Sequence, residues 1–257
     1  MNILAFFAHP DDETMLCGGT LALLAAQGAQ VSILIATRGE GGEMGEPPLC
    51  TREELGAVRE AELRCAAQAL GASRLLVMDY LDPLVGPDDQ LFPFTDNLEQ
   101  LIAEVTAAIH DTQADVLLAH GVNGEYGHPA HLLVHQAAWQ AVQALGNEAP
   151  LFYPIQGVFE GHPFPLLANQ DAPAHLVIDV TPVLAQKTAA ALCHRTQNNL
   201  FVRRRSEDAG RPMSVPEVVM SLSLESVTRA WPPVDDGLPE DAFSALLLHT
   251  GQAIRSA

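Results

Sequence analysis

The chain has 257 residues, of which 48% are hydrophobic and 18% are charged, so it can bury a large core and is not disordered as a whole. Its 32 acidic and 13 basic side chains give a formal net charge of −19, which would repel a nucleic-acid backbone or an anionic membrane. We therefore expect a small-molecule substrate, no nucleic-acid binding and, because no stretch approaches the roughly 20 apolar residues that cross a bilayer, no membrane insertion.

Segments with strand and helix signals alternate along most of the chain. Short apolar runs predict buried strands, and stretches with helical periodicity, capping residues or a terminating glycine predict helices. In chain order we predict a strand over 2–8, a helix over 19–27, a strand over 30–36, a helix over 51–70 that begins with a capping box at Thr51, a strand over 75–78, a helix over 96–111, a strand over 115–120, a helix over 128–145, an extended segment over 152–159, a strand over 175–180 and a helix over 181–198.

The C-terminal segment carries weaker signals. There we predict loops over 203–205 and 232–240 and a short helix over 241–249. The alternation of strands and helices predicts an α/β, Rossmann-like fold with a mainly parallel sheet and helices on both faces. Residues 1–198 would form the core, and residues 199–257 a C-terminal extension packed on the same domain.

The four cysteines, at positions 17, 50, 65 and 193, form no Cys-x-x-Cys pair. The sequence also does not open with a basic segment followed by an apolar one, which would be typical of a secretory signal. We therefore expect reduced thiols and a cytoplasmic protein. The oligomeric state stays open, a homo-oligomer included.

Two polar clusters each follow an apolar run. The first is His9-Pro10-Asp11-Asp12-Glu13, directly after the first predicted strand. The second contains Tyr126, His128 and His131 and follows the strand predicted over 115–120. In parallel sheets ligands bind beyond the carboxyl ends of the strands, so we expect both clusters to meet at that edge and to form the active site there.

The side chains of the two clusters suit a catalytic metal. A catalytic zinc characteristically has three protein ligands and one open position, and His9, Asp12 and His131 could supply that set. Asp11 would remain unligated and could take a proton from the bound water, whose pKa zinc lowers to about 7. The neighbouring histidine and tyrosine, at 128 and 126, could donate hydrogen bonds to an oxyanion or a proton to a leaving amine. These groups predict hydrolysis of an amide or ester, with Zn²⁺ as cofactor and Fe²⁺ or another divalent ion as the alternative.

Each cluster also has a purely structural interpretation. Asp11 or Asp12 could cap the following helix, and His128 and His131 could simply share one face of a first helical turn. A cap alone leaves His9 without a role, and a carboxylate at a helix start can still face a cation. We therefore favour the metal site.

These residues resemble the LmbE-like de-N-acetylase family, which includes the N-acetylglucosaminyl-phosphatidylinositol deacetylases and the sugar deacetylases of mycothiol and bacillithiol synthesis. The two motifs that carry the resemblance stand at 8–14, as Ala-His-Pro-Asp-Asp-Glu-Thr, and at 123–131, as Asn-Gly-Glu-Tyr-Gly-His-Pro-Ala-His. Segments 37–41, 59–62 and 187–197 are similar to further family blocks, so the resemblance extends through about residue 197.

The resemblance implies a role for each matching residue, with one departure. Ala130 stands where most relatives carry Asp, and the loss of a carboxylate beside His128 would lower activity or shift its pH profile. The implied roles are zinc binding by His9, Asp12 and His131, general base catalysis by Asp11, oxyanion stabilisation by His128, assistance in the transition state by a mobile Tyr126, substrate contact by Arg59 and a position near the sugar for Asp82.

Several of these residues have simpler alternatives. Arg59 could instead form a helix-surface salt bridge to Glu62, and Asp82 could be a turn former. His194 and Gln197 could lie behind the pocket or merely pack in a helix. The basic run 203–205 could contact an acidic substituent of a substrate or be solvated surface.

We predict a zinc-dependent de-N-acetylase that hydrolyses the acetamido group of an N-acetylglucosamine derivative, whose conjugate the sequence does not identify. Alternatives are a zinc amidase on a non-sugar amide and, because of Ala130, a metal-binding protein with little activity. A non-haem iron oxygenase could use His9, Asp11 and a distant histidine, but we expect that motif on a jelly roll. A nucleotide-binding loop is disfavoured because Met44 stands where the dinucleotide fingerprint needs glycine.

Overall fold

The computed structural model describes residues 1–234, 239–249 and 253–255. Within these ranges, five parallel strands form the central sheet in the order β3-β2-β1-β4-β5, so the predicted α/β fold with a mainly parallel sheet is confirmed. The order changes direction at β1, and α/β proteins bind ligands at such a switch point. The strands are β1 (Asn2–Phe7), β2 (Gln30–Thr37), β3 (Arg74–Tyr80), β4 (Val116–Ala119) and β5 (Leu151–Pro154).

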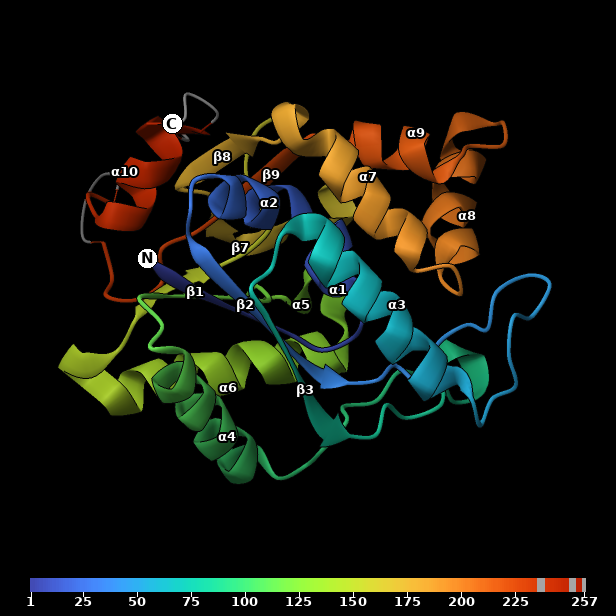
Figure 1. Ribbon diagram of the computed structural model, residues 1–257, viewed down its shortest axis with the longest axis horizontal. Coiled ribbons are helices and arrows are strands. Elements are labelled where there is room, and N and C mark those ends of the chain that lie inside the picture. Colours follow the sequence, from blue (N-terminus) through green and yellow to red (C-terminus); the bar gives the residue numbers. More distant parts are fainter. Residues whose placement is uncertain (235–238, 250–252, 256–257) are drawn as a thin grey trace.

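Helices cover both faces of this sheet (Figure 1). Successive side chains of a strand point to opposite faces, so β1 gives Ile3 and Phe7 to one apolar core and Leu4 and Phe6 to the other. The first core is completed by α2 (Gly18–Ala26), α3 (Leu55–Leu70) and α7 (Leu184–Cys193), and the second by α4 (Leu98–Thr112) and α6 (Pro129–Leu145).

The helix predicted over 51–70 begins later than expected. The Thr51 N–H donates to the Glu54 carboxylate over 3.0 Å, as in a capping box. Residues 52–54 nevertheless form turns, and α3 begins at Leu55. The local hydrogen bond therefore closes a turn in front of the helix and does not start the helix itself.

The helix predicted over 181–198 is interrupted. A 3-10 turn, η4 (Thr181–Val183), leads into α7, which ends at Cys193, and α8 (Asn198–Ala209) starts five residues later. In the gap, the Thr196 N–H and hydroxyl donate to the Glu62 carboxylate at 2.9 and 2.7 Å. Because a side chain takes this N–H, the i to i−4 bonding of a continuous helix is lost there.

The strand predicted over 175–180 is β8 (Leu176–Asp179), but it lies outside the parallel sheet. It pairs antiparallel with β9 (Leu224–Val227) and β10 (Ala253–Arg255). The Glu225 carboxylate on β9 accepts the N–H groups of Gly19 and Thr20 at 2.8 and 2.7 Å. The C-terminal segment thus caps free N–H groups at the start of α2.

The loop predicted over 203–205 is wrong, because these arginines belong to α8. This helix has no buried residue, so it lacks the apolar periodicity that identifies a helix in a sequence. The short helix predicted over 241–249 is confirmed as α10 (Ala242–His249), whereas residues 235–238 of the predicted loop over 232–240 lie outside the described residues.

The remaining elements are short. The described residues contain no helix with the length and apolar character required to span a bilayer. The remaining short elements are α1 (Asp12–Met15), α5 (Gly124–Gly127), α9 (Val215–Ser221), β6 (Gly157–Val158), β7 (Asn169–Pro173) and the 3-10 turns η1 (Pro87–Asp89), η2 (Gly146–Glu148) and η3 (Pro165–Leu167).

Candidate active site

The two polar clusters meet beyond the carboxyl ends of β1 and β4, which are neighbours in the sheet. His9 and Asp12 follow β1, and His131 lies in the first turn of α6. Each of the three offers a possible ligand atom, and these atoms lie within 4.8 Å of one another. The sequence-predicted ligand set is therefore brought together, with all three residues buried.

The distances and hydrogen bonds of this set fit a divalent cation. Asp12 Oδ1 lies 3.4 Å from His131 Nε2, and Asp12 Oδ2 lies 3.3 Å from His9 Nδ1. Ligand atoms of a tetrahedral ion with bonds near 2.1 Å are about 3.4 Å apart, and each histidine lies at about this distance from a different oxygen of Asp12. Glu125 Oε2 contacts His131 Nδ1 at 2.8 Å, which assigns the ring proton to Nδ1 because a carboxylate can only accept. The buried Nε2 of His131 has no hydrogen-bond partner among the described residues, and its lone pair faces Asp12.

The carboxylates around His9 stabilise a positive charge at its imidazole ring. Burial alone would lower the pKa of His9, but hydrogen bonds to Asp12 and Asp82 raise it to about 9. Burial would likewise raise the pKa of Asp12, whereas the imidazoles of His131 and His120 hold it well below its usual range. The site is thus built to keep a carboxylate ionised beside a cation.

Asp11 lies beside this donor set in a strained backbone conformation, with φ of 115°. Its N–H donates to Glu13 Oε2 over 2.8 Å, and its Oδ2 accepts from Arg59 Nη2 over 3.1 Å. Burial raises the pKa of Asp11 to about 6, although the Arg59 guanidinium opposes the rise. A carboxylate with this pKa can accept and release a proton near neutrality.

Arg59 is a buried part of the site wall, with 3% of its surface exposed. Besides Asp11, it donates to the carbonyl oxygens of Pro10 at 2.6 Å and Gly39 at 2.8 Å. The alternative of a helix-surface salt bridge to Glu62 is wrong, because Arg59 points inward from α3 and Glu62 bonds Thr196. The arginine therefore holds Asp11 and the loops on either side of it.

Asp82 reaches the site from the loop after β3. Its Oδ1 lies 3.3 Å from His9 Nε2, and its Oδ2 accepts the N–H of Gly41 at 3.2 Å. Burial would raise the pKa of Asp82, but the hydrogen bond to His9 lowers it. Asp82 thus fixes the ring of a candidate ligand as well as bordering the cavity.

His128 caps α6 and does not lie within its first turn. Its Nδ1 accepts the Ala130 N–H over 3.2 Å, so the ring proton is on Nε2. Burial, together with the nearby imidazoles of His131 and His9, lowers the pKa of His128 to about 3. The backbone of residue 130 thereby orients a neutral N–H donor, although Ala130 carries no carboxylate.

These side chains border one cavity of about 650 Å³. Its lining includes His9, Asp11, Asp12 and His128, together with Tyr126, whose surface is 56% exposed. The Tyr126 ring is 5.7 Å from that of His128. The candidate base, two of the three candidate ligands and both candidate donors therefore border the same cavity, whereas His131 is buried behind it.

A family model described as PIG-L, GlcNAc-PI de-N-acetylase, matches residues 4–142. This protein belongs to the PIG-L family. The resemblance predicted from the two motifs is thus confirmed.

Two curated relatives of this PIG-L protein have the same name. A 1D-myo-inositol 2-acetamido-2-deoxy-alpha-D-glucopyranoside deacetylase of Geodermatophilus obscurus is 34% identical over 58% of this chain and 55% of its own length. A protein of the same name from Rhodococcus erythropolis is 28% identical over 95% of this chain and 97% of its own length. The chain thus spans about half of the first relative and nearly all of the second.

Solved structures establish the fold further. A teicoplanin deacetylase in a zinc-inhibited form has a TM-score of 0.60 at 16% identity, covering 91% of this chain and 100% of its own. The 4-carboxy-2-hydroxymuconate hydratase of Pseudomonas putida has a TM-score of 0.58 at 20% identity, covering 93% and 99%. Because these two proteins are named for different reactions, the fold alone does not identify the reaction of this PIG-L member.

Glu125 and His120 are functional candidates that sequence reasoning does not single out. Glu125 Oε2 lies 2.8 Å from Nδ1 of both His120 and His131. The Ala8 N–H donates to His120 Nε2 at 3.2 Å, which leaves the ring proton on Nδ1. Burial would raise the pKa of Glu125, but the two imidazoles hold it well below its usual range. His120 directly follows the apolar run of β4, at the same sheet edge as His9. This position is the sequence signal from which the pair could have been predicted.

A second buried network supports Asp11 from behind. His194 Nε2 lies 2.8 Å from Glu13 Oε1, and the Thr14 hydroxyl donates to the same oxygen at 2.6 Å. The other oxygen of Glu13 accepts the Asp11 N–H. His194 therefore lies behind the pocket, which is one of the two alternatives drawn from the sequence. It acts on Asp11 through Glu13.

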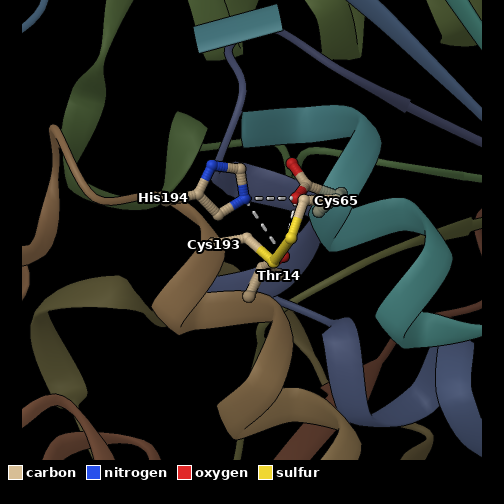
Figure 2. Close-up of a disulfide and its surroundings, with 5 residues drawn as sticks. Thr14, Cys65, Cys193 and His194 are labelled. Carbon is tan, nitrogen blue, oxygen red and sulfur yellow. Dashed lines mark hydrogen bonds and ion pairs between the residues drawn. A yellow bond between two sulfur atoms is a disulfide. The ribbon is translucent and has the colours of Figure 1, made fainter. Parts of the chain in front are cut away.

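A disulfide joins the two helices behind the site. Cys65 on α3 and Cys193 at the end of α7 are bonded, with their Cα atoms 5.7 Å apart, beside Thr14 and His194 (Figure 2). The prediction of reduced thiols is therefore wrong for this pair. The two cysteines are 128 residues apart, so only the packing of α3 against α7 makes them partners.

Proposed function

We propose that this PIG-L-family protein is a zinc-dependent de-N-acetylase that hydrolyses the acetamido group of an N-acetylglucosamine derivative. The observation that carries the proposal is the buried Nε2 of His131, unpartnered within the described chain, facing Asp12 with His9 beside it. Two imidazoles and a carboxylate suit zinc with an open fourth position. The names of the curated relatives support the substrate class.

Asp11 is the group we assign to proton transfer. When bound, zinc supplies Lewis acidity, which polarises an amide carbonyl and lowers the pKa of water. Asp11 accepts the proton of the attacking water, since a pKa of about 6 leaves the carboxyl ionised at neutral pH. The same carboxyl then gives the proton to the nitrogen of the breaking C–N bond, so that acetate and a free amine leave.

We assign His128 and Tyr126 to donate hydrogen bonds to the carbonyl oxygen of the acetamido group. That oxygen becomes negative as water adds to the carbon, and a preplaced donor is worth most at that moment. The Nε2–H of His128 is such a donor, and its pKa of about 3 keeps the ring neutral near pH 7. The Tyr126 hydroxyl, in the partly exposed side chain at the cavity edge, adds a second donor.

Arg59 and Asp82 border the same cavity. We assign them to the substrate site, where they act mainly through the groups they hold. Arg59 fixes the carboxylate of Asp11, and Asp82 fixes the ring of His9.

The α/β fold also argues against the non-haem iron oxygenase, for which a jelly roll is expected.

Acetate release by the zinc-loaded protein tests the proposal. We expect deacetylation of at least one of N-acetylglucosaminyl-inositol, N-acetylglucosaminyl-malate, N-acetylglucosamine and chitobiose, with activity lost on chelation and restored by zinc. Hydrolysis of only simple N-acetyl amines would instead indicate an amidase for non-sugar amides. Bound zinc without any hydrolysis would indicate the silent metal-binding protein that Ala130 suggests.

A further inference from the structure

Exposed apolar side chains gather around the catalytic cavity. Among the described residues, twelve large hydrophobic side chains are exposed, and five of them line this one cavity. Single exposed apolar residues are normal on a protein surface, whereas a contiguous group marks a binding surface. The five are Leu84 (59% exposed), Val85 (49%), Phe92 (38%), Leu200 (45%) and Tyr126 (56%).

Three of the five belong to the loop after β3, which has a defined conformation. The Gly86 N–H donates to the Gln90 carbonyl over 2.8 Å and closes the loop on itself. A Cβ at Gly86 would lie 2.9 Å from the Phe92 ring, so the absence of a side chain lets the ring pack there. The loop thus brings Leu84, Val85 and Phe92 to the cavity, which Leu200 of α8 also lines.

We define the apolar wall as Leu84, Val85, Phe92 and Leu200. The loop that carries the first three of these residues is anchored to the catalytic groups. Asp82, at the start of the loop, contacts His9, as described above. The backbone at Pro83 also lies close to the loop after β2, because a Cβ at Gly41 would lie 2.1 Å from the Pro83 carbonyl oxygen. The start of the loop that carries Leu84 and Val85 is therefore anchored beside the candidate metal site, and a molecule held at that site shares its cavity with the wall.

The charges around the cavity do not favour an acidic ligand. Arg59 is bonded to Asp11, and Arg52 donates its Nη1 to two carbonyl oxygens, those of residues 40 and 42, at 2.8 and 2.6 Å. Arg203, one of the arginines at 203–205, forms two bonds to Glu43, and none of those three lines the cavity as far as the described residues show. Four carboxylates, those of residues 11, 12, 43 and 82, line the same space.

We propose that the apolar wall binds an alkyl or aryl aglycone of the N-acetylglucosaminide and so selects apolar glycosides over polyol and acidic conjugates. This inference rests on the proposed function, which places the acetamido sugar at the metal. A cavity of about 650 Å³ is in the range that holds a whole small molecule, so sugar and aglycone fit the same space. Burial of an alkyl chain against exposed leucine, valine and phenylalanine is the interaction that would add affinity.

Equilibrium binding tests the wall without requiring turnover. Calorimetry on the zinc-loaded full chain compares methyl and heptyl glucosaminide, the amine products, which differ only in the alkyl chain. We expect the heptyl glycoside to bind at least about tenfold more tightly, since each buried methylene contributes favourably. Leu84→Asn should bring the heptyl-to-methyl ratio toward one. Leu192→Asn, an equally polar change at a leucine that is 46% exposed and does not line the cavity, should leave the ratio unchanged.

The outcomes separate the two proposals. Equal affinity for both glycosides, tighter binding of glucosaminyl-inositol than of the heptyl glycoside, or equal weakening of both glycosides by Leu84→Asn would overturn the inference. Loss of a dimer in Leu84→Asn, measured by sedimentation, would overturn it as well, because the wall would then be an interface between two copies. Tighter binding of the heptyl glycoside without acetate release from any N-acetyl glycoside would support the apolar wall as a binding surface. It would overturn the deacetylase proposal alone.

Discussion

Replacing Glu125 with glutamine isolates the support behind the candidate metal ligand. In the native protein Oε2 accepts from Nδ1 of both His120 and His131, and Oε1 accepts from the N–H of Gly121 at 3.0 Å. Glutamine keeps the shape of the side chain but has only one acceptor atom at its end. Whichever way the amide turns, its NH₂ faces an N–H group, so at least one buried donor loses its partner.

The size of the effect follows from this arrangement. An unsatisfied buried donor costs roughly 1–3 kcal/mol. If the amide NH₂ faces His131, that ring keeps its hydrogen bond only by moving its proton to Nε2, the atom that must be free to bind a metal. Loss of the partner behind a metal-bound histidine typically weakens metal affinity about 10- to 100-fold, and we expect the zinc Kd of Glu125→Gln to rise by that factor.

Competition with a chromophoric chelator measures the zinc Kd, and thermal unfolding of the zinc-free protein shows whether the variant is folded. Glu99→Gln, on the exposed face of α4, is the matched control and should bind zinc as the native protein does. A folded Glu125→Gln variant with a zinc Kd within about twofold of the native value would refute the reasoning.

Three further predictions concern the base, a ligand and the disulfide. Asp11→Asn should keep its zinc, measured by elemental analysis, and lose about 100- to 10,000-fold in kcat, and unchanged turnover would remove Asp11 from the base role. His131→Ala should lose most bound zinc, since one of three ligands is gone, and full occupancy would show that the ligand is misassigned. Thiol titration of the unreduced, denatured protein should find two thiols, and Cys193→Ser should lower the free energy of unfolding by about 2–4 kcal/mol in denaturant titrations. Four titratable thiols, or no change in stability, would contradict the disulfide.

The meeting of the candidate metal ligands could be predicted from the sequence because their positions depend on local signals. His9 and Asp12 follow an apolar strand, and His131 lies in the first turn of a helix shortly after another strand. A parallel sheet brings the carboxyl ends of its strands to one edge, and the pairing of β1 with β4 completes the argument. Here the sequence pattern and the topology point to the same place.

Arg59 and His194, which lie behind the candidate ligands, could not be placed in the same way, because their partners are remote in the chain. Arg59 looks like a surface residue of a helix until the loops around Pro10 and Gly39 fold over it. His194 is predicted within a continuous helix, yet the helix ends just before it and the ring turns to Glu13. Contacts between residues that are 20 to 181 positions apart in the chain have no periodicity in the sequence that would reveal them.

Backbone strain connects these remote groups to the chemistry. Asp11 and Glu125 are non-glycine residues with φ of 115° and 56°, conformations that cost of order 1–3 kcal/mol each. Hydrogen bonds offset that cost, from the Asp11 N–H to Glu13 and from the Gly121 N–H to Glu125. The strained backbone directs one carboxylate to the cavity and the other to the back of His131. Removing a supporting hydrogen bond therefore lets the carboxylate move away from its working position, so that a loss of function is expected even where the fold survives.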